Sequence, residues 1–414
     1  MYMIYCFYLK SKCFSQRHRA LEEKSKEKKR EVHSMRIGLL GFGTVGRGVY
    51  DLTAPRTDMC VVKVLCRREL TIPGVTVTHS FEDILKDDSI DTVVEVMGGL
   101  HPAFEYVRQA ILAGKNIVTA NKAMLAAFYD DLIPLAEQKG VSLRCTASVG
   151  GGIGWLTALE RTTRVETVTR ISGIMNGTCN YILDSMGRLG LAYSEALHQA
   201  QKLGYAEADP TTDIDGIDTW NKLIVSANVA FGVSLDPAGI PAAGIRNIRA
   251  EDVVNFKNHN YVCKLMAEAQ RRDGVCRAWV QPTLCPAGEP EAAVPTNYNL
   301  ITLEGEACGR QSFFGQGAGR YPTAYNVVQD CMDILAGTGY YGPCGEKTAV
   351  DNSCLLRYYV RGGLWPANLT EERWGNALVT QPVSVETMHR WLQGHPDAFA
   401  AALPDSSAAD GSAV

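Results

Sequence analysis

The amino-acid sequence predicts an α/β protein with a doubly wound parallel sheet, followed by a second domain of the α+β type. Three observations support this prediction. Apolar strand patterns alternate with helical patterns between residues 35 and 119, a glycine-rich turn joins the first strand to the first helix, and the alternation becomes less regular after residues 150–152. Strands and helices that alternate at this spacing are typical of a parallel sheet covered by helices.

The first part of the chain supplies the strands of this sheet. Short apolar runs predict buried strands at residues 35–40, 61–65, 92–97 and 116–119. Helices are expected directly after the glycine-rich turn, from the short segment 81–85, and over residues 102–113.

The second part of the chain has weaker patterns. Residues 166–174 alternate polar and apolar side chains, as a half-buried strand does, and further strands are expected at 278–284 and 299–303. Helical patterns cover residues 194–202, 218–231 and 323–334. We expect the last of these helices to pack back onto the first domain.

Composition and charge exclude several classes of protein. A chain of 414 residues has room for two or three domains, and its 46% hydrophobic residues are ordinary for a globular protein. The net charge of −4 gives no basic surface for nucleic acid. No run reaches the roughly 18 apolar residues of a membrane span. The 13 cysteines form no CxxC pair or Cys/His cluster at zinc spacing, which predicts reduced thiols in the cytoplasm.

Both ends of the chain differ in composition from the rest. Residues 1–8 are aromatic and apolar, and residues 22–30 form a charge run, whereas a secretory signal has its positive charge before the apolar stretch. We expect a disordered extension over residues 1–34, with Met35 as the natural start; a short membrane-surface anchor is the alternative. Residues from 405 onward, rich in Ser, Ala and Asp, are also expected to be disordered.

The glycine-rich turn has the spacing of a dinucleotide site. Gly41, Gly43 and Gly46 follow a predicted strand and open a helix, with Thr44 and Val45 inside the turn. The first glycine allows a tight turn, and the second lets the backbone approach a pyrophosphate, whose charge the helix N-terminus favours. This context predicts a Rossmann-type domain; a glycine-rich turn without a ligand is the alternative.

The end of the second strand bears on the choice between NAD and NADP. An acidic residue there would bind the ribose hydroxyls of NAD, but this chain has Arg67 and Arg68 instead. Guanidinium groups suit a 2′-phosphate, which favours NADP. The alternative is that both arginines point into solvent.

Two further segments carry charged side chains suited to chemistry. Lys122 follows the strand at 116–119, at the sheet edge where ligands bind in such folds; a surface lysine is the alternative. Residues 207–218 hold five carboxylates, and Asp218 and Lys222 are four apart, so they share one face of a helix. A solvated acidic loop or a calcium loop is the alternative, but the ligand spacing of a calcium loop is missing.

These motifs together resemble the homoserine dehydrogenase family, and the similarity extends from residue 35 to about residue 334. In chain order the matching segments are GxGxVG (41–46), VVxVxGG (93–99), TANK (119–122), SVGGG (148–152), NGTxNYIL (176–183), GYAEADPTxDxxGxDxxxKL (204–223) and GxGAGxxPTAxxVxxD (315–330). So many motifs in one order are far more specific than any one of them.

The resemblance implies a role for each matching residue. Lys222 would donate the proton to the aldehyde, Asp218 would orient it, and Lys122 would support it. The substrate would be held by Glu207 and Asp213, which take its α-amino group, by the backbone of Gly177 and Thr178, and by Tyr205. The cofactor, NADP or NAD, would contact the glycine turn, Arg67, Arg68, Gly98, Lys122 and Gly317.

The family also places a monovalent cation, Na⁺ or K⁺, on main-chain oxygens that match Val149, Gly151 and Ile153. This chain departs from the family nearby, because Thr146 stands where a glutamate ligand is usual and Gly154 where proline is usual. Beside the expected catalytic lysine, Trp220 replaces a small residue and is expected to narrow the pocket or alter the oligomer contact.

Many members of the family carry a regulatory ACT domain after the catalytic part. Residues 355–361 look like the first strand of one, but too few residues follow for a complete module. We therefore expect an incomplete ACT-like remnant and no feedback control through it.

The resemblance implies an NAD(P)-dependent oxidoreductase, acting as a homodimer, that interconverts L-aspartate 4-semialdehyde and L-homoserine in threonine, methionine and isoleucine biosynthesis. The alternatives are a related dehydrogenase for another small amino-acid-like aldehyde or alcohol, and an inactive NADP-binding sensor.

The expected domains are an extension (1–34), the nucleotide-binding domain (35–160), the substrate-binding, catalytic and dimerisation domain (161–318), a segment returning to the nucleotide domain (319–345) and the tail (346–414).

Overall fold

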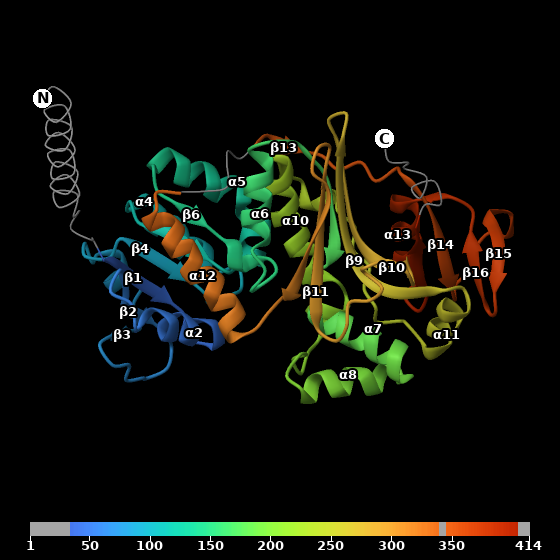
Figure 1. Cartoon of the computed structure of the whole chain (residues 1–414), viewed down its shortest axis with the longest axis horizontal. Coiled ribbons are helices and arrows are strands. Elements are labelled where there is room, and N and C mark those ends of the chain that lie inside the picture. Colours follow the sequence, from blue (N-terminus) through green and yellow to red (C-terminus); the bar gives the residue numbers. More distant parts are fainter. Residues whose placement is uncertain (1–33, 339–344, 405–414) are drawn as a thin grey trace, which may run out of the picture.

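A computed structural model of the protein describes residues 34–338 and 345–404. Figure 1 shows two sheets side by side, with the first part of the chain at one end of the molecule and the last strands at the other. The predicted extension up to residue 33 and the predicted disordered end from residue 405 lie outside the described residues. Within the described ranges, no helix has the length and apolar character needed to cross a membrane.

The first sheet has six parallel strands in the order β3-β2-β1-β4-β5-β6. This order confirms the predicted doubly wound sheet, whose ligand crevice lies where the order reverses, between β1 and β4. Its strands are β1 (Met35–Leu40), β2 (Met59–Leu65), β3 (Thr76–Thr78), β4 (Thr92–Glu95), β5 (Asn116–Thr119) and β6 (Leu143–Arg144). The helices beside it are α2 (Thr44–Thr53), α3 (Glu82–Leu85), α4 (Ala103–Leu112) and α5 (Lys122–Lys139).

A helix from much later in the chain also packs against this sheet. Helix α12 (Arg320–Leu335) contributes Ala324 and Val327 to the core that contains Ile37 and Val118. This helix packs closely against α2 at Gly48, which has no side chain. A Cβ atom added to Gly48 would lie only 2.8 Å from the Cβ atom of Ala324. In Figure 1 this helix lies across the first sheet, beside elements from the first part of the chain.

The second sheet has ten strands and is mixed, with the long hairpin of β9 and β10 at its centre. Its strands are β7 (Val168–Ile174), β9 (Tyr261–Arg272), β10 (Val275–Pro286), β11 (Tyr298–Gly305), β12 (Gly309–Gln316), β14 (Leu355–Arg361), β15 (Thr370–Trp374), β16 (Ala377–Thr380), β17 (Val383–Ser384) and β18 (Phe399–Leu403). The associated helices are α6 (Trp155–Thr163), α7 (Gly177–Leu189), α8 (Tyr193–Lys202), α9 (Thr211–Ile214), α11 (Ala250–Asn258) and α13 (Val385–Gly394). A separate two-stranded sheet joins β8 (Ser234–Leu235) to β13 (Lys347–Thr348).

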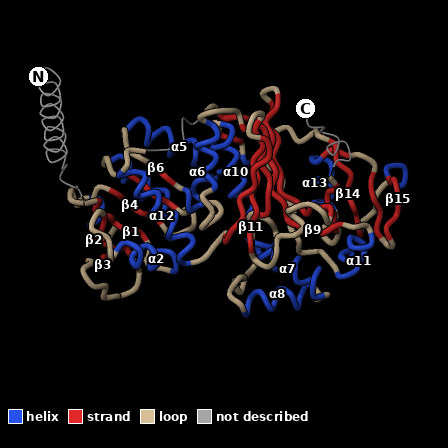
Figure 2. The backbone as a smooth tube through the Cα atoms, in the orientation of Figure 1, coloured by secondary structure: helices blue, strands red, loops and turns tan. Residues whose placement is uncertain are grey.

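Helix α10 (Ile217–Phe231) lies between the two sheets and is buried on almost every side. It packs against α5 and α6 on one side and against β7, β9 and β10 on the other (Figure 2). Glycines with left-handed backbone bound it at both ends, with φ of 83° at Gly216 and 60° at Gly232. Polar side chains on this helix are therefore held in a closed environment.

The last part of the chain forms an ordered unit that continues the second sheet. Strands β18, β14, β16 and β15 are adjacent in that order, and β18 pairs in parallel with β10. This is the strand order of a ferredoxin-like βαββαβ unit. The helix that would follow β14 is replaced by residues 362–369, where only a 3₁₀ turn forms at Ala367–Leu369.

Candidate active site

The glycine turn between β1 and α2 has the geometry that a pyrophosphate needs. Gly41 has a φ of 100°, in the region that favours glycine. A Cβ atom at Gly46 would lie 2.2 Å from the carbonyl oxygen of Gly41, so helix and turn touch there. A Cβ atom at Gly43 would meet nothing within 4 Å, so this backbone faces open space at the start of α2. The three glycines therefore occupy the positions expected for a nucleotide site, with Thr44 and Val45 in the first turn of the helix.

The buried carboxylate of Glu95 ties together the two neighbouring loops of the sheet edge. It accepts hydrogen bonds from the backbone N–H of Met97 at 2.7 Å and of Gly98 at 3.3 Å, and from Thr119 Oγ1 at 2.6 Å. Burial raises the pKa of Glu95, and these donors oppose the rise. Sequence reasoning missed this residue, although a carboxylate inside an apolar strand was a usable signal.

The two arginines after β2 are exposed at the same edge. Arg68 donates to the carbonyl oxygen of Phe42 at 3.2 Å, so one guanidinium is attached to the glycine turn itself. No hydrogen bond or ion pair to Arg67 is seen within the described part of the chain.

A buried carboxylate joins the two lysines that the sequence singled out. Asp218 Oδ2 lies 2.7 Å from Lys222 Nζ, and Asp218 Oδ1 lies 3.2 Å from Lys122 Nζ. Lys222 also donates to the carbonyl oxygen of Met175 at 2.7 Å. Burial alone would raise the pKa of Asp218. The ammonium groups of Lys222 and Lys122 have a larger effect and hold the pKa of Asp218 well below its usual range. Because Lys122 is the first residue of α5, the cluster meets the ligand edge of the first sheet.

Asn176 connects this cluster to the acidic segment. Its Nδ2 donates to Asp213 Oδ1 at 2.7 Å and to Asp218 Oδ2 at 2.8 Å, while its Oδ1 caps α7 by accepting from the N–H of Cys179. Burial and the charge of Asp218 raise the pKa of Asp213. The sequence motif contained Asn176, but its bridging role was missed because its partners are 37 and 42 residues away.

The remaining residues expected to bind substrate surround this cluster. Glu207 is exposed, and its charge, after those of Asp218 and Asp213, helps to raise the pKa of Lys122. Thr178 Oγ1 donates to the carbonyl oxygen of Tyr205 at 2.6 Å, which links the first turn of α7 to the acidic segment. The N–H groups of Gly177 and Thr178 lie in that first turn, where a helix has no carbonyl partner for them.

The residues expected to hold a monovalent cation do not fit one. The carbonyl oxygens of Gly151 and Ile153 both accept from Asn326 Nδ2, at 2.5 and 3.1 Å. Thr146 is turned to Asp330, with its Oγ1 2.6 Å from Asp330 Oδ1. Val149 is buried in the same segment. Gly317 packs against this loop, because a Cβ atom at Gly151 would lie 2.6 Å from the carbonyl oxygen of Gly317.

Of the two expectations for Trp220, a narrower pocket does not match the structure, and an altered oligomer contact stays a prediction. Trp220 Nε1 donates to the carbonyl oxygen of Ile240 at 2.9 Å. On a helix, residues two apart point in nearly opposite directions, so the indole lies away from Asp218 and Lys222.

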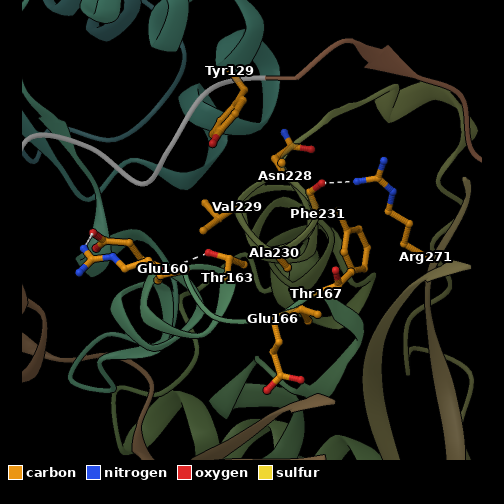
Figure 3. Close-up of a pocket in the computed structure, with 13 residues that line it drawn as sticks. Tyr129, Glu160, Thr163, Glu166, Thr167, Asn228, Val229, Ala230, Phe231 and Arg271 are labelled. Carbon is orange, nitrogen blue, oxygen red and sulfur yellow. Dashed lines mark hydrogen bonds and ion pairs between the residues drawn. The ribbon is translucent and has the colours of Figure 1, made fainter. Parts of the chain in front are cut away.

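A large cavity lies at the other end of α10 and is not this site. It measures about 470 Å³ and is lined by residues of α5, α6 and α10 together with Arg271, which donates to the carbonyl oxygen of Phe231 (Figure 3). Phe231 is nine positions beyond Lys222, about 14 Å along a helix. None of the residues expected to act on substrate or cofactor lines this cavity.

Comparisons with known proteins cover both parts of the chain. The family model for the homoserine dehydrogenase NAD-binding domain matches residues 41–146, and the homoserine dehydrogenase model matches residues 155–332. The homoserine dehydrogenase of Bacillus subtilis is 36% identical over 337 residues, which is 76% of this chain and 78% of that protein. The enzyme of Lactococcus lactis is 37% identical over 318 residues, or 73% and 74% of the two chains. A crystal structure of a homoserine dehydrogenase from Thiobacillus denitrificans has a TM-score of 0.81 at 29% identity, covering 90% of this chain and 98% of that one.

A nucleotide-binding sheet whose ligand edge meets a proton-bearing lysine is the arrangement of a dehydrogenase, and this chain is an NAD(P)-dependent oxidoreductase acting on a CH–OH group. The matches extend over most of the chain and most of its relatives. The chain therefore belongs to the homoserine dehydrogenase family.

Proposed function

We propose that the protein interconverts L-aspartate 4-semialdehyde and L-homoserine with NADP, and that Lys222 is the proton donor. The observation that carries this proposal is the Asp218 carboxylate between Lys222 and Lys122, at 2.7 and 3.2 Å. The nicotinamide, when bound, supplies or accepts the hydride. The protein then has to stabilise the charge that develops on the substrate oxygen.

The hydrogen bonds of Lys222 leave it one proton to give. An ammonium group has three N–H donors. Two of them are taken by Asp218 Oδ2 and by the carbonyl oxygen of Met175. These bonds fix the direction of the third, which we assign to the substrate oxygen. Lys122, whose side chain is 35% exposed beside the same carboxylate, helps to stabilise the negative charge that develops on the substrate oxygen. It lies at the start of α5, at the cofactor edge of the first sheet.

The polar groups around this lysine suit an amino-acid-like substrate. Asp213 and Glu207 offer carboxylate oxygens to its α-amino group. The N–H groups of Gly177 and Thr178, at the N-terminus of α7, suit its carboxylate. Tyr205 is 38% exposed, and its carbonyl oxygen accepts from Thr178 Oγ1, so it lies beside the first turn of α7. This arrangement supports the roles proposed for all five residues.

Three finer properties belong to the same proposal. Arg68 beside the glycine turn, with Arg67, supports NADP over NAD. The edge strand β12 is largely exposed and carries Phe314, which supports a homodimer, because an exposed strand edge favours pairing with another chain. The described cysteines are reduced, which supports a cytoplasmic location. The proposed reaction would belong to threonine, methionine and isoleucine biosynthesis.

The direct test is turnover by the purified protein with L-homoserine and either NADP or NAD, followed by nicotinamide absorbance. We expect oxidation of L-homoserine with a preference for NADP. NADPH binding without turnover would favour a cofactor-binding sensor, and faster turnover of a longer or differently charged alcohol would favour a related dehydrogenase. Trp220 does not support the alternative of a related dehydrogenase, since its indole points away from the lysine cluster.

A further inference from the structure

We propose that the side-chain amide of Asn326 takes the place of a monovalent cation in this chain. Asn326 lies on α12 and is 2% exposed, while its acceptors, the carbonyl oxygens of Gly151 and Ile153, are in the loop before α6. Two carbonyl oxygens converge on one donor atom at 2.5 and 3.1 Å. An amide has one end that only donates, so chemistry alone places Nδ2 between two acceptors.

The surrounding charges favour the amide over a metal ion. An anionic partner stabilises a buried cation, because an uncompensated charge away from water is costly. The residue placed to supply one is Thr146, whose hydroxyl is neutral. The nearby carboxylate of Asp330 faces Thr146 and Arg144 instead: it accepts from Thr146 N at 2.8 Å, from Thr146 Oγ1 at 2.6 Å and from Arg144 Nε at 3.2 Å.

The loop that Asn326 holds lies against a segment assigned to cofactor binding. The N–H of Gly152 donates to the carbonyl oxygen of Gln316 at 3.1 Å, and Gly151 is in close contact with Gly317. By fixing Gly151 and Ile153, the amide fixes the backbone on which the Gly317 segment rests. Asn326 therefore acts by positioning the loop backbone. This role does not depend on whether the substrate is homoserine.

The inference is tested by thermal unfolding in chloride salts of equal ionic strength, with NaCl or KCl compared to choline chloride. The unaltered protein should melt within about 1 °C in all three. Asn326→Asp would place a carboxylate against two carbonyl oxygens, and a metal ion would relieve that repulsion. We expect this variant to melt about 3 °C or more higher in NaCl or KCl than in choline chloride.

Asn326→Leu is the matched control. It removes the donor without creating a cation site, so it should lose stability equally in all three salts. If the unaltered protein itself melts several degrees higher in NaCl or KCl than in choline chloride, and Asn326→Leu loses that difference, a cation binds at this loop and the inference is overturned. That comparison decides the question even if Asn326→Asp does not fold. Because the readout is unfolding, it is separate from the proposed activity.

Discussion

Asp218 and Lys222 lie one turn apart on α10, with the carboxylate Oδ2 of Asp218 2.7 Å from Nζ of Lys222. Both side chains are 9% exposed, so this pair is not the solvent-facing ion pair that the same spacing often produces. Burial alone would neutralise such groups, yet the two lysines beside Asp218 keep its pKa low and its carboxylate charged. A charged carboxylate that holds a lysine in one direction is the basis of the proposed proton transfer.

The two arginines after β2 should determine cofactor choice. Replacing Arg67 with Asp and Arg68 with Gly removes the guanidinium groups and adds an acceptor for ribose hydroxyls. We expect the ratio of kcat/KM for NADP over NAD to fall at least about tenfold, which is about 1.4 kcal/mol. Arg108→Ala, an exposed change on α4, should leave the ratio unchanged. An unaltered protein that already prefers NAD tenfold would contradict this reading of the arginines.

Glu95 should be required for cofactor affinity without contributing to proton transfer. Glu95→Ala removes the acceptor for Met97 N, Gly98 N and Thr119 Oγ1, so the loops after β4 and β5 lose their common anchor. We expect NADPH to bind about tenfold more weakly, measured by quenching of protein fluorescence. Glu82→Ala, which removes only the exposed pair with Lys86, is the control. Unchanged NADPH affinity in Glu95→Ala would show that the loops are held by other contacts.

Asn176 should contribute separately to stability and to activity. Asn176→Ala removes the cap of α7, worth about 1 kcal/mol, and also the amide between Asp213 and Asp218. Asn176→Ser restores a capping oxygen but not the bridge. We expect the melting temperature to recover in the serine variant, while kcat/KM stays about tenfold or more below normal. Recovery of both together would mean that the asparagine acts only as a cap.

The buried imidazole of His389 should make stability depend on pH. Burial lowers its pKa from 6.5 to about 4, and it lies 3.0 Å from Gln281 Oε1. Between about pH 4 and 6.5 the unfolded chain therefore binds a proton that the folded protein does not. Stability should fall as pH falls through this window, by about 3 kcal/mol at most.

His389→Gln removes this titration, so its free energy of unfolding, measured by urea denaturation, should depend less steeply on pH between 4 and 6.5. The exposed residue His198 provides the control: His198→Gln should keep the steep dependence. Equal slopes in the unaltered protein and in His389→Gln would show that the imidazole is not kept neutral by burial.

Local patterns in the sequence predicted the first sheet well. The strands expected at 35–40 and 116–119 are β1 and β5, because a buried parallel strand is a short apolar run. Helix α5 was missed, since it contains Pro134 and a non-helical kink at Phe128. The strand expected at 278–284 lies within β10, but its partner β9 and the turn between them were missed, although the Asp273-Gly274 pair at that turn was a usable signal.

The site was predictable where its contacts are local. The pair of Asp218 and Lys222 follows from helical spacing, whereas the carbonyl of Met175 and the ammonium of Lys122 come from distant segments. The amide of Asn326 at Gly151 and Ile153 is likewise a contact across more than a hundred residues. Single-sequence patterns carry no information on such pairings, which explains why the cation expectation did not fit.

The central claim, that Lys222 donates the proton, is tested most directly by the steady-state kinetics of Lys222→Ala with L-homoserine and NADP. We expect kcat to fall about 100-fold or more while KM changes much less, because the bond is made mainly in the transition state. NADPH affinity should be unchanged, which also shows that the variant is folded, and Lys222→Arg should not restore kcat, since guanidinium holds its protons too tightly. A raised KM with an unchanged kcat would contradict the claim and would make Lys122 the donor.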